Sequence, residues 1–359
     1  MGFKNKGEEL YEKIYATVRR YSAKTRRIKQ FKKITNQKTL TAAQRAEVKA
    51  FYAPYKKPHL VFHNFFTEKT GIFCANYIPQ DLYVGYIDPY FNDIKGAKYL
   101  DNKCYFDAIF HQIPQPYLVL KRINRIWLGN DCKPVSKEEM ELIIRSEQTG
   151  MFVKEAQTSA GGHGVTFVES NDDAPAKVFE IAEKIPTDIV IQRPLVQHAD
   201  LARINDSSVN TLRLYSVLGK DGEVTIYSAV LRMGNAGSKV DNYAAGGISC
   251  GIDENGKLRK NGYNKKGQQV LVHPASGIVF EGYEVPSYAR AVELVKKAHP
   301  LVPHFRSVSW DIAIVADGTP TLIEANLCRG GIDLLQLNNG PLFGKDTKKI
   351  LDEVFGKKN

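Results

Sequence analysis

The sequence lacks paired cysteines and long apolar runs, and each absence excludes a class of protein. Its five cysteines stand singly, which argues against a zinc site and a disulfide framework and fits a reducing cytoplasm. No apolar run approaches the ~20 residues of a membrane-spanning helix. Residues 1–6 contain two lysines and no apolar core, so we expect no secretory signal there.

Acidic residues are scarce only at the N-terminal end. Residues 1–57 hold 16 Lys or Arg against 4 Asp or Glu, so the formal net charge of +11 belongs to this segment and the rest of the chain is close to neutral. We expect residues 1–57 to form a basic helical extension that could contact an anionic membrane, an acidic glycan or nucleic acid. A solvated helix face explains the charge at least as well.

The composition is otherwise that of an ordinary globular protein, with 43% hydrophobic and 25% charged residues over 359 positions. Apolar residues at three-to-four spacing predict a helix over 8–33, and Thr41 can cap a second helix that ends near Phe51. Residues 59–63 are predicted to form a strand. Residues 77–90 are rich in β-formers and aromatics, which favours a small α/β segment.

Further helices are predicted by periodicity and by their end signals. Ser136 with Glu139 is a capping box for a helix through about Arg145. The other predicted helices cover 100–113, 174–185, 288–298 and 343–356.

A glycine-rich turn lies between two predicted strands, 151–154 and 165–169, with Lys154 just before it. The turn contains Ser159, Ala160, Gly161, Gly162, His163 and Gly164. Backbone N–H groups in such a turn can bind an anion, and the lysine ammonium can contact phosphate oxygens. The turn lacks the Gly-Lys-Ser/Thr of a P-loop. Taken alone, it is more often a plain turn.

Two short apolar runs near the C-terminal end, 310–314 and 322–327, alternate like the paired strands of a hairpin. Asp311 shares a strand face with Ala313, while Glu324 shares one with Asn326. If the two faces coincide, two carboxylates and an amide oxygen converge. Such hard oxygen ligands suit Mg²⁺, whose remaining positions usually carry phosphates. An ordinary hairpin with solvated acids is the alternative.

Three polar stretches lie between these motifs. A strand over 211–217 places Arg213 on the face opposite its leucines. A strand over 189–196 is interrupted by Pro194, which indicates that sheet pairing ends there. The glycine-rich segment 234–251 has the composition of a ligand-covering loop.

The order of these features resembles the ATP-grasp superfamily over roughly residues 100–340. The family pattern begins with an Asp-Lys helix start and a Lys before a Gly-rich hairpin, and continues with a hinge strand for adenine. A phosphate-contacting Arg, a polar loop and an Asp…Glu-x-Asn metal hairpin follow. The matching positions are Asp101 with Lys103; Lys154 with Ser159, Gly161, Gly162, His163 and Gly164; Gln192, Arg193, Pro194 and Leu195; Arg213; Asn242; and Asp311, Glu324 and Asn326.

More narrowly, three stretches resemble the sugar-transfer associated ATP-grasp group, namely 210–213, 241–247 and 273–274. Members of that group are associated with surface-polysaccharide biosynthesis in bacteria. The resemblance implies an ATP-grasp fold of the α+β (α/β) class, in which two α+β subdomains, 104–193 and 194–359, clasp ATP. The basic extension over 1–57 and a pre-ATP-grasp α/β segment over 58–103 would precede them.

The resemblance also implies roles for individual residues. Asp311, Glu324 and Asn326 would hold one or two Mg²⁺, for which Mn²⁺ could substitute. Lys103, Lys154 and Arg213 would spread positive charge over the transferring phosphoryl group. The ribose acceptor would be His198 or Asp200, and the sequence does not choose between them. Each could equally be an ordinary loop residue.

Three departures from the family pattern stand out. The helix start reads Asp-Asn-Lys, so Lys103 is displaced by one residue. Gln192 replaces the usual hinge acid, although its amide oxygen can still accept a hydrogen bond from adenine. Ser309 stands where amino-acid ligases of the superfamily often carry an Arg. The oxyanion role would then pass to Arg329 or to the Gly330 and Gly331 amides.

The resemblance implies a carboxylate–amine ligase that acts through an acyl phosphate and forms a carbon–nitrogen bond. We expect a uronic-acid carboxylate of a surface polysaccharide or its precursor, joined to an amino acid or other amine. We expect a cytoplasmic enzyme, at the inner membrane face if residues 1–57 bind lipid. An ATP-grasp kinase acting on a hydroxyl is the alternative. An inactive nucleotide-binding scaffold and a nucleic-acid-binding protein are less favoured.

Overall fold

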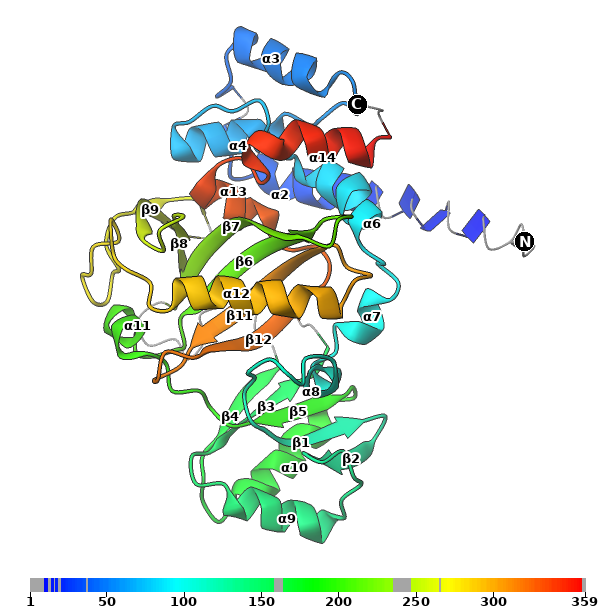
Figure 1. Ribbon diagram of the computed structural model, residues 1–359, viewed down its shortest axis with the longest axis vertical. Coiled ribbons are helices and arrows are strands. Elements are labelled where there is room, and N and C mark those ends of the chain that lie inside the picture. Colours follow the sequence, from blue (N-terminus) through cyan, green and yellow to red (C-terminus); the bar gives the residue numbers. More distant parts are fainter. Residues whose placement is uncertain are drawn as a thin grey trace.

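The computed structural model describes residues 10–356, except 12–13, 16, 19–20, 37, 158–163, 235–246 and 265. Within this part of the chain, two antiparallel sheets lie one beyond the other (Figure 1). The smaller sheet has the strand order β2-β1-β5-β3-β4, and the larger has the order β10-β9-β8-β7-β6-β11-β12. No described helix is long and apolar enough to cross a membrane.

The smaller sheet packs against two helices. Its strands are β1 (Leu118–Ile123), β2 (Ile126–Gly129), β3 (Met151–Glu155), β4 (Val165–Val168) and β5 (Ile189–Gln192). Helices α9 (Lys137–Ser146) and α10 (Ala174–Lys184) share a buried apolar cluster with these strands. The predicted Ser136–Glu139 capping box is present at the start of α9. Both strands predicted around the glycine-rich turn are confirmed.

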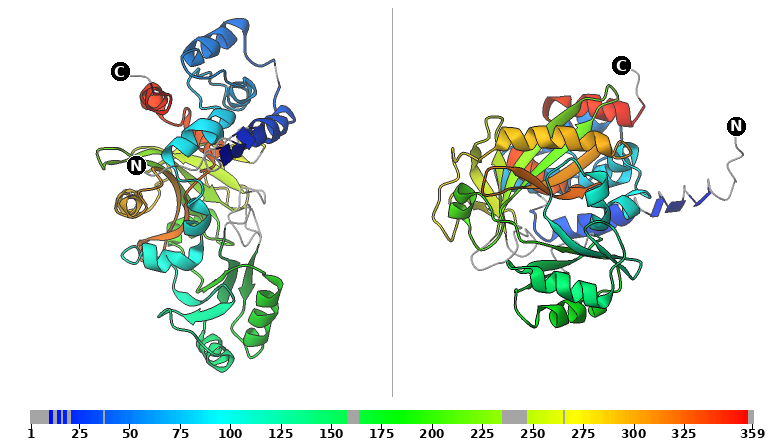
Figure 2. Two further views of the ribbon diagram at one scale, coloured as in Figure 1. Left: turned by 90° about the vertical axis from the view of Figure 1, so that its right-hand side faces the viewer. Right: turned by 60° about the horizontal axis from the view of Figure 1, so that its bottom comes forward.

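The larger sheet is covered on both faces. Its strands are β6 (Thr211–Leu218), β7 (Val224–Met233), β8 (Ile248–Ile252), β9 (Leu258–Asn264), β10 (Gln269–Val270), β11 (Ser307–Ile314) and β12 (Pro320–Asn326). On one face, Leu212, Leu214 and Trp310 pack with helix α12 (Tyr288–Ala298). On the other, Tyr215 and Val230 pack with α13 (Ile332–Asn339) and α14 (Thr347–Val354). Figure 2 shows these layers edge-on.

The N-terminal third is helical, so two expectations were wrong. Helix α4 (Val61–Thr70) replaces the strand predicted over 59–63, because the apolar residues continue at helical spacing and Phe65 and Phe66 are both buried. Residues 77–90 form α5 (Gln80–Leu82), the π-helix η2 (Tyr83–Ile87) and the start of α6 (Asp88–Phe91). Aromatic residues fit a buried helix as well as a strand, which misled the prediction.

The remaining helices complete the framework. The helix predicted over 8–33 is present at its described positions and includes the π-helix η1 (Ala23–Arg27) and α2 (Ile28–Lys32). Helix α3 (Ala42–Tyr52) begins at the predicted Thr41 cap. The helix predicted over 100–113 is broken into pieces, because the Asn102 side chain caps a new turn at Cys104. These pieces are α7 (Ala97–Leu100), the 3₁₀ turn η3 (Lys103–Tyr105) and α8 (Phe106–Ile109). Helix α11 (Ala199–Ile204) links the two sheets.

Candidate functional site

Three polar residues lie side by side across the larger sheet. In the strand register, Arg213 on β6 is opposite Asp311 on β11, and Asp311 is opposite Glu324 on β12. The predicted hairpin is therefore confirmed, and its two acidic positions share one sheet face. Arg213 also pairs in register with Val230, which packs toward α13, so the polar row lies on the α13 face.

Two arginines hold the Asp311 carboxylate. Arg213 donates from Nε to Oδ1 at 2.8 Å and from Nη2 to Oδ2 at 2.7 Å, and Arg232 donates from Nη1 to Oδ2 at 2.8 Å. Burial alone would raise the pKa of Asp311, but the Arg213 and Arg232 charges outweigh it and lower the pKa to about 2. Asp311 is therefore ionised at any physiological pH.

Two lysines lie beside Glu324. The Lys103 ammonium donates to Glu324 Oε1 at 2.8 Å, and Lys154 donates to Gln192 Oε1 at 3.0 Å. Burial and the Lys103 charge together lower the pKa of Lys154 to about 8, and the Glu324 charge partly opposes both effects. Lys103 begins η3 and Lys154 lies on β3, so both lysines belong to elements outside the larger sheet, and Lys103 bonds to it directly.

The oxygen ligands fit a hard divalent cation. Asn326 donates from Nδ2 to the Ser309 carbonyl at 3.2 Å, which leaves its amide oxygen as an acceptor. No cluster of three or more His, Cys, Asp or Glu with metal-ligand geometry occurs in the described part of the chain. The candidate set is therefore two carboxylates and one amide oxygen, an oxygen-only donor set that suits Mg²⁺.

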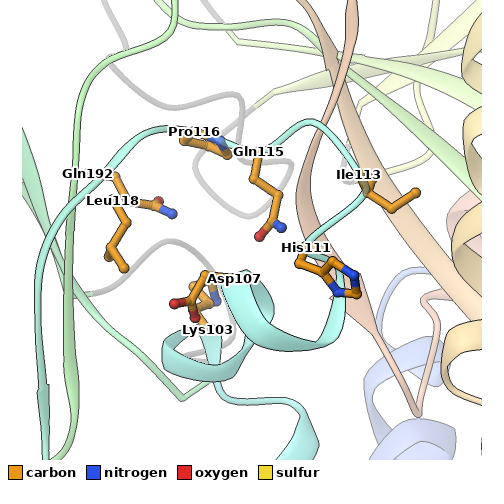
Figure 3. Close-up of a pocket in the computed structure, with 8 residues that line it drawn as sticks. All are labelled: Lys103, Asp107, His111, Ile113, Gln115, Pro116, Leu118 and Gln192. Atoms are coloured by element: carbon orange, nitrogen blue, oxygen red, sulfur yellow. The ribbon is translucent and has the colours of Figure 1, made fainter. Parts of the chain in front are cut away.

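The end of β5 borders a pocket of about 250 Å³. Lys103 and Gln192, both predicted from the sequence, line it together with residues that were not predicted. These are Asp107, His111, Ile113, Gln115, Pro116 and Leu118. Figure 3 shows Gln192 on one side of this space and Asp107 and Gln115 on others. The pocket thus lies between the end of β5 and the elements η3 and α8.

Arg193 is directed elsewhere. Its backbone N–H donates to the Tyr117 carbonyl, and its guanidinium lies 3.9 Å from the centre of the Tyr117 ring. The same guanidinium forms a bidentate pair with Glu147, at 2.7 and 3.0 Å. Its side chain therefore ties β5 to the end of α9. The hinge position that it occupies, before Pro194 and Leu195, remains a prediction.

His198 and Asp200 have local partners. His198 Nδ1 accepts a hydrogen bond from the Asp200 N–H and caps α11, and the His198 N–H donates to the Ile314 carbonyl. These bonds place the start of α11 against the end of β11. These contacts do not distinguish His198 from Asp200 as the ribose acceptor, which remains a prediction.

The Gly330–Gly331 turn contacts the polar row from the side of α13. A Cβ at Gly330 would lie 2.5 Å from Ser309 Oγ, and one at Gly331 would lie 3.3 Å from Arg213 Nη1. Ser309 donates from Oγ to the Gly330 carbonyl at 2.7 Å, and the Gly331 N–H donates to the Arg329 carbonyl at 2.6 Å. Arg329 itself is exposed, with φ of 58°. Its oxyanion role remains a prediction.

Five predicted ligand residues lie outside the described residues: Ser159, Gly161, Gly162, His163 and Asn242. Gly164 is described, and its φ of 82° with a hydrogen bond from the Glu155 N–H fits a tight turn. Arg232 was missed. The available signal was an arginine inside the otherwise apolar stretch 229–233, which is unusual for a buried strand.

Solved structures with a similar chain course include three enzymes. One is the L-amino acid ligase from Bacillus licheniformis, with 14% identity over 71% of this chain and 47% of that chain and a TM-score of 0.39. Another is a biotin carboxylase–β-γ-ATP complex from Campylobacter jejuni, with 11% identity, 72% and 47% coverage and a TM-score of 0.45. The third is D-alanyl-alanine synthetase A from Vibrio cholerae, with 15% identity, 75% and 66% coverage and a TM-score of 0.41.

This chain spans about half the length of the first two of these structures. A search of curated proteins found no match. The family model described as "Sugar-transfer associated ATP-grasp" matches residues 84–351, which is well over half of the 359 residues and contains every candidate site residue named above. The chain belongs to the sugar-transfer associated ATP-grasp family.

Proposed function

We propose that this protein is an ATP-dependent carboxylate–amine ligase that forms an acyl phosphate. The observation that carries the proposal is the charge balance around the hairpin. Four cationic side chains (Lys103, Lys154, Arg213 and Arg232) surround only two carboxylates, those of Asp311 and Glu324. The site therefore holds an excess of positive charge, which suits a polyphosphate.

The ion pairs of this structure can exchange when nucleotide binds. Phosphate oxygens would take N–H donors from the lysines and arginines, because such charge-assisted bonds form equally well to phosphate and carboxylate. Glu324 and Asp311 would then have oxygen atoms free for Mg²⁺. When bound, the cation would neutralise charge on the β- and γ-phosphates.

The proposed reaction has two steps. An oxygen of the substrate carboxylate attacks the γ-phosphorus, and the bond between that phosphorus and its bridging oxygen breaks to release ADP. The amine then attacks the acyl carbon, phosphate leaves, and the amine loses a proton. Lys103, Lys154 and Arg213 would hold the transferring group by charge and position, which supply most of the catalysis in phosphoryl transfer.

The substrate class that we propose is a uronic-acid carboxylate of a surface polysaccharide or its precursor, joined to an amino acid or other amine. The family description supports a sugar-linked substrate. An amide product requires both a carboxylate and a nucleophilic amine, so neither alone should sustain turnover beyond slow hydrolysis. An ATP-grasp kinase would instead need only a hydroxyl acceptor.

A product assay tests the proposal. ADP release would be measured over a panel of uronic acids crossed with amines, and ³¹P NMR would identify the phosphorus product. We expect ADP and free phosphate in equal amounts, with an amide, only when both substrates are present. A stable phosphoester product would show that the enzyme is a kinase and not a ligase. Glu324→Gln serves as the inactive control, since it keeps the side-chain shape and removes the charge.

A further inference from the structure

The N-terminal helix carries an unusual set of exposed apolar side chains. Six large ones lie within twelve positions, each between 37% and 69% exposed: Leu10, Tyr11, Ile14, Tyr15, Val18 and Tyr21. Leu10, Ile14 and Val18 recur every four residues, so they form one stripe, and Tyr11 and Tyr15 stack beside it with ring centres 6.3 Å apart. Single exposed apolar residues are ordinary, but a contiguous stripe marks an interaction surface.

The base of this helix is firmly docked. Ile28 and Phe31 are buried in an aromatic cluster with Phe62 and Phe65 of α4. The described positions before residue 22 project away from the body of the molecule, as the views in Figures 1 and 2 agree. Lys95 is near the stripe, with its ammonium 5.0 Å from the Tyr11 ring. The stripe therefore extends from a fixed support into solvent.

Basic residues accompany the stripe. Arg26, Lys29, Lys32 and Lys33 are exposed between the stripe and α3. They belong to the segment 1–57, which carries 16 Lys or Arg against 4 Asp or Glu. A helix that combines an apolar stripe with basic residues is suited to a membrane interface, where both the apolar area and the attraction to anionic lipid contribute to binding.

We infer that the described residues of the N-terminal helix, from Leu10 to Lys33, form an interfacial anchor that binds an anionic lipid surface. The stripe would enter the boundary between headgroups and acyl chains, and the exposed basic residues would contact the headgroups. A second copy of the chain is a poor occupant, because it would bring two strongly basic segments together. An acidic glycan would pair with the charges but leave Leu10, Ile14 and Val18 in water. The inference does not depend on the proposed ligase reaction.

Vesicle sedimentation tests the anchor with the full chain. We expect binding to vesicles of phosphatidylcholine with phosphatidylglycerol, weaker binding to phosphatidylcholine alone, and loss of binding at high salt. The triple variant Leu10→Ser, Ile14→Ser, Val18→Ser should bind at least about tenfold more weakly, because its charge is unchanged but its apolar area is lost. Arg26→Gln with Lys29→Gln and Lys32→Gln should weaken binding to the anionic vesicles only.

The matched control is Ile126→Ser, Leu142→Ser, Leu301→Ser, which removes three exposed apolar side chains from other surfaces. It should bind vesicles as the wild type does, and all three triple variants should keep wild-type ATP turnover in solution. Equal vesicle binding by the stripe variant and the wild type would overturn the inference. So would a wild-type dimer in size-exclusion chromatography that the stripe variant dissociates, or acidic oligosaccharide binding in place of vesicle binding.

Discussion

Asp311 and Glu324 are direct cross-strand partners, yet different cations hold the two carboxylates. Asp311 accepts three hydrogen bonds from two arginines that rise from the same sheet, whereas Glu324 accepts one from Lys103 on a separate turn. Asp311 is therefore held by two cations of its own sheet, whereas Glu324 is held by a single cation from outside that sheet. The two positions should respond differently to substitution.

Glu324→Gln should abolish ATP turnover while the protein stays folded. The amide keeps a hydrogen-bond acceptor for Lys103 but carries no charge to bind Mg²⁺, so we expect a loss of at least about 100-fold. Steady-state ADP release measures the loss, and circular dichroism with thermal melting checks the fold. Wild-type turnover in this variant would contradict the placement of the cation.

Asp311→Asn should reduce stability in a pH-dependent way. Its removal leaves the partly buried Arg213 and the buried Arg232 without a carboxylate, which costs about 3 kcal/mol of unfolding free energy at pH 7. The folded pKa of Asp311, about 2, is below its ordinary value, so the wild-type carboxylate stabilises the fold above pH 4. That stabilisation disappears as the pH falls toward 2.

Urea unfolding of both proteins across pH 2.5–7 measures this difference. The two free energies of unfolding should converge at the acid end and diverge toward neutral pH. Asp311→Asn combined with Arg232→Met should recover part of the loss, because one uncompensated charge is then removed. A constant difference across the whole range would indicate a purely steric effect.

Lys154 should make nucleotide binding pH-dependent near pH 8. Burial and the neighbouring Lys103 charge lower its pKa to about 8, so the ammonium loses its proton just above neutral pH. Because phosphate binds the charged form, the Kd for ATP should rise by up to about tenfold per pH unit above pH 8. Calorimetric titration from pH 7 to 9.5 measures it. In Lys154→Arg, whose side chain stays charged, the same pH change should leave the Kd nearly constant.

Local patterns predicted the site's strands and helix caps well. The hairpin with Asp311 and Glu324, the face of Arg213 and the Ser136 capping box all follow from rules that span only a few residues, and all are present. Within the sequence, the hairpin acids are thirteen residues apart and joined by a tight turn. Their convergence could therefore be predicted without knowing the rest of the fold.

Contacts between distant segments could not be predicted in this way. The Lys103–Glu324 pair joins residues 221 positions apart, and Arg232 reaches Asp311 from a strand two places away in the sheet order. Such partners depend on how the sheet is assembled, which no single strand pattern specifies. The strand predicted over 59–63 was wrong for a related reason, since its apolar residues suit a buried helix equally well and only packing decides between them.

Asp333, in the first turn of α13, should destabilise the fold at neutral pH. Burial raises the pKa of its carboxyl to about 6, and the Arg27 charge partly opposes this. A carboxyl that is harder to ionise when folded leaves stability unaffected below pH 4 and lowers it as the pH rises toward 6. Asp333→Asn should therefore raise the free energy of unfolding at pH 7.5 by up to about 3 kcal/mol, with little gain at pH 4.

Arg27 provides the stringent test of that explanation. It lies in η1 of the N-terminal helix, and its charge acts on Asp333 at the start of α13, beside the Gly330–Gly331 turn. Arg27→Gln should lower stability at pH 7.5, and it should lower it much less when Asp333 is already Asn, because the partner charge is gone. Exposed Glu183→Gln on α10 is the control and should change neither value. Additive effects of the Arg27 and Asp333 substitutions would mean that the two charges do not interact, and the Arg27 charge would then not oppose the effect of burial on the pKa of Asp333.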